Sequence, residues 1–329
     1  MSDPALAAAE LTDERGRLEP TPIGPILGRR DLGGYRGMHE LLGALAEPVA
    51  RGARVRLVGR SARGLRLFGF EVGPPEATDV TVVVAGLHPI EWIGVETAMT
   101  LLEALAERPP PDRRVFVVPI ANPDGFAEVE ANLRAGRRRF VRHNARGVDL
   151  NRNFPSFWGW PSLARLLLGP VFARGKAAAS EPEVRALVDT LVALPIDRAL
   201  SLHSFGGAVL HPYGARLARP GRLAELEEHA GEIARASDPR RPYRVAQSSR
   251  WVPGFTATGM EIDWFYDHHG ALALLVECSR GGLAGRPWGD LARAASEPFA
   301  WFNPREPAPV ATAIAAACLP FVRGVGGPE

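Results

Sequence analysis

The sequence of 329 residues contains very little cysteine and almost no lysine. Cys278 and Cys318 are its only cysteines, too few for a disulfide framework, and this favours a reducing compartment. Lys176 is the only lysine, so arginine supplies nearly all of the positive charge. Together with the abundant alanine, glycine and proline, this usage is typical of genomic base-composition bias, and we attach no function to it.

The sequence also lacks a charge excess and long apolar runs. Its 39 basic and 37 acidic side chains leave a formal net charge of +2, which argues against nucleic acid or an anionic membrane as the main partner. The amino terminus has neither a basic region nor a long apolar core, and no apolar run is long enough to span a bilayer. We therefore expect a cytoplasmic protein without a signal peptide.

Length alone does not decide between one large domain and two small ones, but the absence of a dividing segment favours one domain. A chain of this size can bury a sizeable core, and neither an internal repeat nor a low-complexity linker divides it. Residues 1–30 are charged and interrupted by closely spaced prolines, so we expect a loosely ordered leader there. Residues 31–329 would then form the single folded domain.

Short apolar runs alternate with helical spacing along most of the chain. Four runs of β-branched or aliphatic residues are typical of buried strands: residues 81–85, 115–119, 197–202 and 271–276. A β-hairpin is predicted over residues 55–58 and 65–72, and a hairpin-like piece over 209–213. Helices are predicted over residues 35–45, 91–106, 222–236, 261–267 and 288–301. The predicted fold class is α/β, with a mixed, mostly parallel central sheet and helices on both faces.

Two polar motifs predict local structure outside these runs. Asn122-Pro123-Asp124-Gly125 follows the second strand and has the composition of a turn. Ser180-Glu181-Pro182-Glu183 has the spacing of a capping box, with Ser180 at the N-cap of a helix that runs to Leu194. The first motif would reverse the chain, and the second would start a helix.

Two histidines and two carboxylates follow three of the predicted strands. His88 and Glu91 come after the first strand, His203 after the third and Glu277 after the fourth. Open α/β sheets gather their ligand sites at the carboxyl ends of strands, so we expect these four side chains to converge. Taken singly each has an ordinary alternative: a chance His-x-x-Glu spacing, a core histidine, a surface carboxylate.

Two imidazoles and one carboxylate make a His₂Glu site that leaves one position on zinc open for water. One zinc ion per chain, held by His88, Glu91 and His203, would lower the pKa of that water to about 7. Glu277 beside it would accept a proton as general base and later deliver it to a leaving amine. The sequence therefore predicts metal-assisted hydrolysis of an amide.

An ordered set of motifs spanning roughly residues 35–305 resembles the zinc carboxypeptidases of the carboxypeptidase A type, metallopeptidase family M14. In chain order the motifs are Gly86-x-His88-Pro89-x-Glu91-Trp92, Asn122-Pro123-Asp124-Gly125, Arg142-x-Asn144, Gly147-Val148-Asp149-x-Asn151-Arg152-Asn153, Ser180-Glu181-Pro182-Glu183, His203-Ser204 with Pro212-Tyr213-Gly214, and Ile262-Asp263-Trp264 ahead of Glu277. The His₂Glu ligand set is already known for that family. The resemblance implies a carboxypeptidase-like catalytic domain over residues 31–329.

The resemblance also implies a role for each matching residue. The ligands and the general base would be the four residues named above. Arg142 would polarise the scissile carbonyl and hold the developing oxyanion. Asn151 and Arg152 would grip the terminal carboxylate of the substrate, for which a guanidinium fork suits a planar anion. Asp149 would accept a hydrogen bond from the second ring nitrogen of His88 and so fix its tautomer.

Phenylalanine stands at two positions where that family usually has tyrosine. Phe255 precedes Gly259 by the family's spacing, and Phe205 lies two residues after His203. Phenylalanine keeps an apolar lid but loses the phenol's hydrogen bond, worth on the order of 1 kcal/mol. The loss bears on substrate affinity or identity. Ile262 lies where the family lines an apolar side-chain pocket, which mildly favours an uncharged terminal residue.

Three functional interpretations stay open from the sequence. The first is a zinc metallocarboxypeptidase that removes the carboxy-terminal residue of a peptide. The second is a zinc amidohydrolase on the same scaffold, acting on a cell-wall peptide, a γ-glutamyl chain or an acylated amino acid, because Asn151 and Arg152 suit any substrate with a nearby free carboxylate. The third is a non-catalytic peptide-binding protein, against which Glu277 beside a full ligand set argues. No pattern indicates an oligomeric state.

Overall fold

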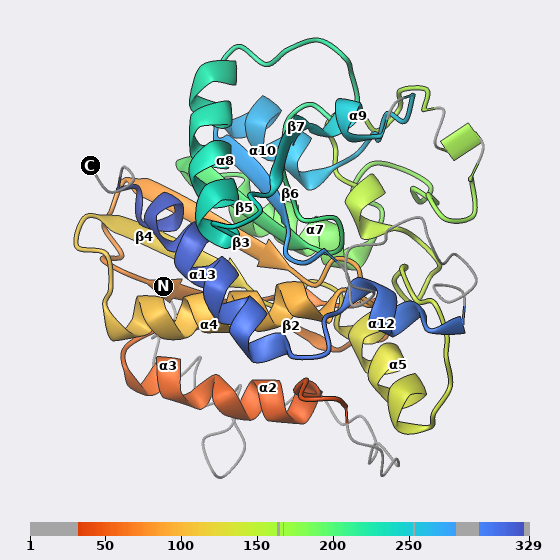
Figure 1. Cartoon of the computed structure of the whole chain (residues 1–329), viewed down its shortest axis with the longest axis horizontal. Helices are drawn as coiled ribbons and strands as arrows, with labels where there is room; N and C mark the ends of the chain where they lie inside the picture. Colours follow the sequence, from red (N-terminus) through yellow and green to blue (C-terminus); the bar gives the residue numbers. More distant parts are fainter. Residues whose placement is uncertain (1–31, 163–164, 167, 253, 281–295, 326–329) are drawn as a thin grey trace.

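The computed structural model describes residues 32–162, 165–166, 168–252, 254–280 and 296–325. These residues form one sheet of eight strands: β1 (Arg54–Arg60), β2 (Arg66–Val72), β3 (Asp79–Ala85), β4 (Arg113–Val118), β5 (Ile196–His203), β6 (Ala208–His211), β7 (Arg244–Gln247) and β8 (Leu272–Glu277). Their order across the sheet is β1-β2-β4-β3-β5-β8-β6-β7. Strands that are far apart in the sequence therefore lie side by side (Figure 1).

The middle of the sheet is parallel and its flanks include antiparallel pairs. β3 pairs in parallel with both β4 and β5, and β5 pairs in parallel with β8. β1 and β2, β2 and β4, and β6 and β8 are antiparallel, whereas β7 runs parallel to β6. The sheet is mixed and mostly parallel, which confirms the predicted fold class.

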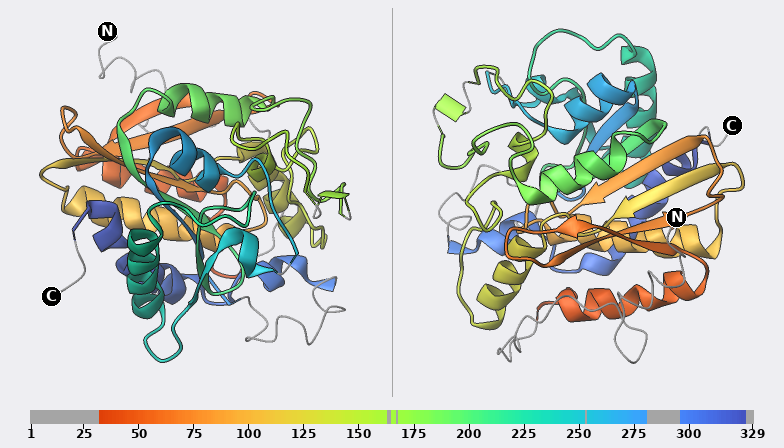
Figure 2. Two further views of the ribbon diagram at one scale, coloured as in Figure 1. Left: turned by 90° about the horizontal axis from the view of Figure 1, so that it is seen from above. Right: turned by 180° about the vertical axis from the view of Figure 1, so that it is seen from behind.

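Helices cover both faces of this sheet. They are α2 (Met38–Ala44), α3 (Ala46–Ala50), α4 (Trp92–Glu107), α5 (Pro123–Arg134), α7 (Pro182–Leu191), α8 (Leu223–Ser237), α9 (Ser248–Trp251), α10 (Glu261–His269), α12 (Pro298–Phe302) and α13 (Pro307–Arg323), with one 3-10 turn, η1 (Leu150–Arg152). Helices α4, α8 and α13 lie on one face, and α7 and α10 lie on the other (Figure 1, Figure 2). The result is a three-layer sandwich with an apolar core on each side of the sheet.

Strand β3 is buried on both sides. Val83 and Ala85 belong to the core beneath α4 and α13, whereas Val82 and Val84 belong to the core beneath α7 and α10. Because successive side chains of a strand point to opposite faces, a strand covered by helices on both faces needs an unbroken apolar run. The run over residues 81–85 meets this requirement, and it delivers the following turn to the edge of the sheet.

The predicted turn at residues 122–125 is wrong, because the segment is the start of helix α5. Pro123 is the first helical residue, and the side chain of Asn122 accepts a hydrogen bond from the backbone N–H of Gly125 at 3.1 Å. An asparagine N-cap followed by proline is a favoured helix start. The same residue types favour turns, so composition alone chose the wrong alternative.

The predicted capping box is displaced by one residue. Glu181, not Ser180, is the N-cap of α7, and the helix ends at Leu191 rather than Leu194. The hydroxyl of Ser180 donates instead to the Glu181 carboxylate, at 2.9 Å. Glu183 accepts from the backbone N–H of Ala62 at 3.0 Å rather than folding back on its own helix. The side chains of Ser180 and Glu183 therefore bond to other partners and do not form a capping box.

Two further predictions have mixed outcomes. Residues 209–213 do not form a hairpin: β6 pairs with β8 and β7 instead. Of the closing helix predicted over residues 288–301, the part before residue 296 lies outside the described residues, and α12 begins at Pro298. The predicted leader, residues 1–30, also lies outside them. No helix in the described ranges is long and apolar enough to cross a membrane.

Candidate active site

The structure brings His88, Glu91, His203 and Glu277 to one edge of the sheet. His203 and Glu277 are the last residues of β5 and β8 and are partners in the parallel ladder. His88 and Glu91 lie in the turn between β3 and α4, and Glu91 is the N-cap of that helix. The convergence follows from topology, because β3, β5 and β8 are adjacent and parallel.

Helix α4 approaches β5 very closely at Gly94. A Cβ atom built on Gly94 would lie only 2.7 Å from the backbone oxygen of Leu202, the residue before His203. Only glycine lets the two backbones come so close, because any side chain would press against main chain that cannot move aside. This contact sets the start of α4, and with it Glu91, against the end of β5.

His88, Glu91 and His203 form a cluster that fits one metal ion. The Nδ1 atom of His88 lies 2.9 Å from Oε1 of Glu91, and the Nδ1 atom of His203 lies 2.8 Å from Oε2. The two Nδ1 atoms are 3.1 Å apart. One potential ligand atom from each residue lies within 4.8 Å of the others, and all three side chains are buried. Two imidazole nitrogens and a carboxylate facing one point are a donor set that suits zinc.

The charges around this cluster favour a cation at its centre. Burial opposes ionisation of Glu91, but His88 and His203 outweigh it and hold the pKa of Glu91 well below its usual range. Burial also opposes the charge on His203, yet Glu91 and Glu261 raise its pKa to about 10. The surrounding carboxylates therefore support positive charge at the point where the two rings meet.

Each histidine has a second buried carboxylate at its outer ring nitrogen. The Nε2 atom of His88 lies 3.0 Å from Asp149, as the family resemblance implies. The Nε2 atom of His203 lies 3.0 Å from Glu261, a residue that the sequence did not single out. Both carboxylates are completely buried. In the sequence Glu261 is only the residue before Ile262-Asp263-Trp264, and nothing there indicates that it contacts His203.

Arg142 is held in place by the partner of His88. Its Nε atom donates to Asp149 at 2.9 Å, and its Nη1 atom lies 3.8 Å from Glu91. Burial opposes the guanidinium charge, but Asp149 and Glu91 outweigh it and raise the pKa of Arg142. A fixed cation thus lies beside the cluster, as the resemblance implies.

Glu277 lines the same cavity as the cluster and is almost completely buried. Its Oε2 atom has no hydrogen-bond partner among the described residues. Burial, together with the nearby charge of Glu91, raises the pKa of Glu277 well above its usual range. Glu277 therefore has a buried oxygen that bonds to no described residue, in surroundings that disfavour its negative charge.

Arg152 is a partly buried cation that forms no direct ion pair with a carboxylate in the described part of the chain. One nitrogen donates to the backbone oxygen of Asn151 at 2.5 Å, and Nε is buried without a hydrogen bond. The guanidinium carbon lies 4.9 Å from the ring centre of Phe172. Burial lowers the pKa of Arg152. A partly buried guanidinium that lines a cavity and has no direct ion pair there is a suitable site for an anion.

The side chain of Asn151 makes hydrogen bonds inside the protein rather than being free for the substrate, as its predicted role would require. Its side-chain oxygen accepts from the backbone N–H of Glu261 at 3.1 Å, and its side-chain nitrogen lies 3.2 Å from Nε2 of His203. The amide borders the cavity, but most of its hydrogen-bonding capacity is used inside the protein. Arg152 is the freer of the two groups.

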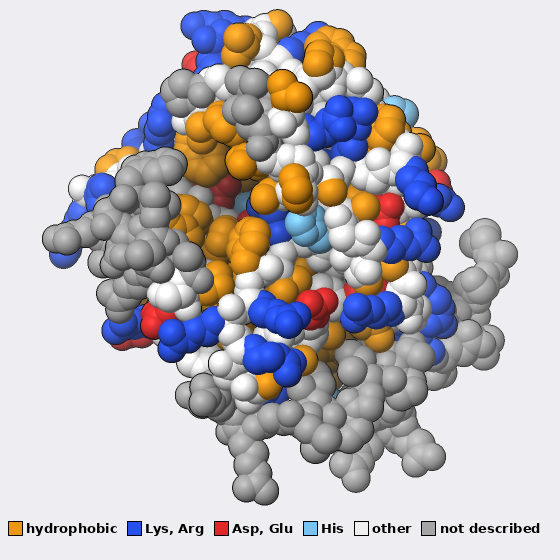
Figure 3. Space-filling view, turned by 90° about the vertical axis from the view of Figure 1, so that its right-hand side faces the viewer, with side chains coloured by type: hydrophobic (Ala, Val, Ile, Leu, Met, Phe, Trp, Pro, Cys, Tyr) orange, Lys and Arg blue, Asp and Glu red, His pale blue; other side chains and the backbone are white. Residues whose placement is uncertain are grey.

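The cavity that contains this cluster has a volume of about 280 Å³ and two chemically distinct parts. The polar part holds the cluster, Glu277, Arg142, Asn151 and Arg152. The rest is mostly apolar and is lined by Phe172, Phe205, Leu210, Trp251, Val252, Phe255, Ala257, Met260, Leu275 and Phe302. Figure 3 shows the molecule from the side, where hydrophobic and basic side chains surround a hollow.

The two phenylalanines lie in this wall, but Ile262 does not. Phe205 packs edge-on against Trp301 and Phe302, with ring centres 5.1 and 5.2 Å away. Ile262 is completely buried in the core beneath α10 and is not among the residues that line the cavity. Ile262, in the first turn of α10, packs in the core, whereas Met260 at the N-cap of the same helix lines the cavity.

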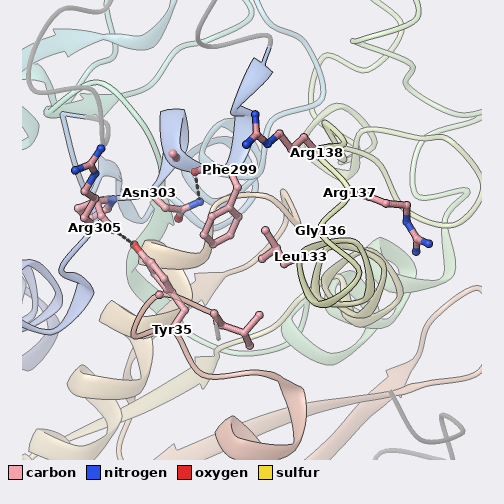
Figure 4. A pocket seen from close by; sticks show the side chains of 12 residues that line it. Tyr35, Leu133, Gly136, Arg137, Arg138, Phe299, Asn303 and Arg305 are labelled. Atoms are coloured by element: carbon pink, nitrogen blue, oxygen red, sulfur yellow. Dashed lines mark hydrogen bonds between the residues drawn. The ribbon is translucent and has the colours of Figure 1, made fainter. Parts of the chain in front are cut away.

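A larger cavity, of about 400 Å³, lies on the other side of α12 and has different chemistry. Its walls include Tyr35, Leu133 and Phe299, with arginines at the rim (Figure 4). The described residues that line it include no histidine and no carboxylate, so it is not the candidate active site. Its contribution is indirect, because Asn303 at its edge donates to the backbone oxygen of Ile90 at 2.7 Å and steadies the turn that carries the cluster.

Residues 38–287 match the family model for zinc carboxypeptidases, Peptidase_M14. The chain belongs to the zinc carboxypeptidase family. The match covers most of the chain and contains every residue of the cluster, which confirms the resemblance seen in the sequence.

The curated relatives of this chain are distant. Carboxypeptidase A2 of Mus musculus is 28% identical over 198 residues, which is 56% of this chain and 47% of the relative. Carboxypeptidase A4 of Mus musculus is 26% identical over 238 residues, 68% of this chain and 56% of the relative. The chain thus spans about half the length of the curated relatives it matches.

Solved structures agree on the fold. Carboxypeptidase A from Helicoverpa armigera superposes with a TM-score of 0.66 at 21% identity, covering 95% of this chain and 78% of that one. Thrombin-activatable fibrinolysis inhibitor gives 0.71 at 20% identity, covering 92% and 77%. At such identities the likeness establishes the architecture, and the site must be argued from its own residues.

Proposed function

We propose that this chain is a zinc-dependent metallocarboxypeptidase that hydrolyses the carboxy-terminal peptide bond of a peptide. The observation that supports it best is Arg152. A partly buried guanidinium that forms no ion pair among the described residues shares one cavity with the His88, Glu91 and His203 cluster and with Glu277. A substrate with a terminal carboxylate would neutralise Arg152 and place its last peptide bond near the cluster.

His88 and His203, through Nδ1, and Glu91 would hold the zinc ion. Bound there, zinc supplies a Lewis acid that polarises a carbonyl and lowers the pKa of water to about 7. The buried carboxylates at the outer nitrogens keep both rings oriented with Nδ1 inward.

Glu277 would act as general base and then as general acid. A zinc ion at the cluster would offset the burial and favour the ionised form of Glu277. The carboxylate oxygen that has no hydrogen-bond partner among the described residues could then take the proton of the attacking water. The same group then gives that proton to the nitrogen of the leaving amino acid. Arg142, fixed by Asp149, would hold the negative charge that develops on the carbonyl oxygen.

The apolar wall supports an uncharged terminal side chain on the substrate. Leu210, Met260 and Leu275 line the cavity, and its only charged lining residues within the described ranges are those of the cluster together with Glu277, Arg142 and Arg152. Burying a charged side chain against such a wall would cost several kcal/mol without a partner. An aliphatic or aromatic terminal residue fits better.

The test compares matched substrates. A peptide with a free carboxy terminus and the same peptide as its carboxamide differ only in the group that Arg152 would bind. We expect turnover of the acid and at least a tenfold lower kcat/KM for the amide, and equal rates would contradict the proposal. Turnover of γ-glutamyl, acylated or cell-wall substrates in place of ordinary peptides would assign the same site to an amidohydrolase.

We also propose that residues 31–329 are the catalytic domain and residues 1–30 an accessory leader, in a cytoplasmic protein. Cys278 and Cys318 are both buried and unbridged, which is compatible with a reducing compartment. A chain that starts at residue 31 should keep full kcat/KM, and cell fractionation would check the compartment.

A further inference from the structure

Glu261 is a buried carboxylate that the fold alone does not explain. It begins α10, is completely buried, and its Oε2 atom has no hydrogen-bond partner among the described residues. Its one ion pair within the described ranges is with His203. A buried carboxylate with so few partners destabilises a protein unless a cation compensates its charge. Positive charge near Glu261 is available from Arg152 and from the direction of His203.

The geometry places Glu261 in line behind a metal ligand. His203 has Glu91 at Nδ1, 2.8 Å away, and Glu261 at Nε2, 3.0 Å away. Ser201 donates its hydroxyl to the same oxygen of Glu261. Ser201 and His203 are two residues apart on β5, so their side chains share one face and reach the carboxylate together. Ser201 and His203 together therefore fix the orientation of the Glu261 carboxylate.

Asn151, the other neighbour of Nε2 of His203, does not offer an acceptor, so the ring depends on the carboxylate of Glu261. When Nδ1 of a neutral imidazole binds a metal, its proton must reside on Nε2, and that N–H needs an acceptor. The side chain of Asn151 cannot supply one, because its oxygen accepts from the backbone N–H of Glu261 and its NH₂ group faces Nε2 at 3.2 Å. Without Glu261, the ring N–H would be buried against another donor.

We propose that Glu261 is a positioning residue for the metal centre: it accepts the Nε2 proton of His203 and, with Asp149 behind His88, directs both Nδ1 atoms toward one zinc ion. The inference rests on the proposed metal site. It adds a carboxylate from helix α10, 58 residues after its histidine, to a motif set in which only Asp149 had such a role.

The test is zinc affinity, measured by competition with a chromophoric chelator at fixed pH. Glu261→Gln keeps an acceptor oxygen but loses the charge, whereas Glu261→Ala loses both. We expect the zinc Kd to rise in the order wild type, Gln, Ala, with the alanine variant weaker by about 10–100-fold. Asp149→Asn should weaken binding comparably through His88.

Asp263→Asn is the matched control. Asp263 is equally buried on the same helix, but it accepts from the backbone N–H groups of Gly214 and Ala215 at 2.8 and 2.9 Å and has no contact with a ligand. It should lower the melting temperature and leave the zinc Kd within about threefold, well below the effect expected for a ligand's partner.

The possible outcomes are decisive. Glu261 variants that bind zinc within about threefold of wild type would overturn the proposal. If circular dichroism shows that Glu261→Ala does not fold, the near-isosteric Gln variant decides by the same criterion. A wild-type protein that binds no zinc would instead contradict the proposed function, so the two failures are distinguishable.

Discussion

His203 and Glu277 are ladder partners at the ends of the parallel strands β5 and β8. One belongs to the metal-ligand cluster and the other is the proposed base, so the hydrogen bonds of the sheet fix their separation. The relative position of the two residues therefore does not depend on the conformation of a loop. Substitutions at either residue should therefore change chemistry without changing the frame around it.

Glu277→Gln should abolish most turnover while leaving zinc bound. The amide keeps the shape of the side chain but cannot accept a proton, so we expect kcat to fall by about 10²–10⁴-fold. Metal content, measured after gentle purification, should remain at one zinc per chain. A variant with near-normal kcat would eliminate Glu277 as the base.

Arg152→Met should impair recognition of the substrate's carboxylate. Loss of a charge-assisted hydrogen bond worth about 1.5–3 kcal/mol predicts a kcat/KM lower by about 10–100-fold on acid substrates. On the carboxamide the variant and wild type should be similar. Arg185→Met, an exposed arginine on α7, is the control and should behave as wild type on both. Equal losses on acid and amide would argue against a carboxylate clamp.

Phe255→Tyr and Phe205→Tyr test what the missing phenols cost. Both rings line the cavity, and a phenol that reaches the substrate would add a hydrogen bond worth about 1 kcal/mol. We expect KM to fall by about fivefold in at least one variant, with little change in kcat. Phe140→Tyr, at an exposed ring, controls for added polarity. Higher KM in both variants would mean that the wall is selected for its apolar surface.

Metal removal should destabilise the fold. Because the turn with His88 and Glu91 meets the end of β5 with His203 only in the folded protein, zinc binds the folded chain and not the unfolded one. At a free zinc concentration of 1,000 times Kd the expected gain is about 4.1 kcal/mol, visible as a higher melting temperature in calorimetry. His203→Asn should lose this zinc-dependent shift. A melting temperature indifferent to zinc in the wild type would contradict the site.

Gly94→Ala should weaken zinc binding from a distance. The added methyl group would press on Leu202 and displace the start of α4, and overpacking of this kind costs about 1–3 kcal/mol of stability. We expect a lower melting temperature and a higher zinc Kd. Gly43→Ala in α2, where a Cβ would meet nothing within 4 Å, is the control and should stabilise the helix slightly. If Gly94→Ala binds zinc as tightly as wild type, the contact between Gly94 and Leu202 does not help to position the metal ligands.

The sequence predicted the parts of the site that follow from strand ends. His88, His203 and Glu277 come directly after apolar runs, and the order of a parallel sheet places such residues together. The role of Asp149 could be predicted only from the family motif that surrounds it. The role of Glu261 could not be predicted from the sequence, because its contact with His203 depends on how α10 packs behind β5, which no local spacing encodes.

The failures in the fold have a similar origin. Asn122 and Ser180 are residue types that serve turns, caps and tertiary contacts equally well, so composition could not choose among them. Ile262 was assigned to the pocket, but the phase of α10 turned it into the core and left the wall to Met260. Tertiary contacts decided the outcome for Ser180 and Ile262, whereas Asn122 took the local alternative of a helix N-cap.

The strands that carry the site are inner strands of the sheet, whereas β1 and β7 are its edges. Edge elements open first in local fluctuations, and central strands exchange their amide protons only when the whole molecule opens. Amides of β3, β5 and β8 should therefore be among the slowest to exchange. A molecule that has transiently frayed at both edges would still hold its ligands together, so its capacity for chemistry would outlast the first steps of unfolding.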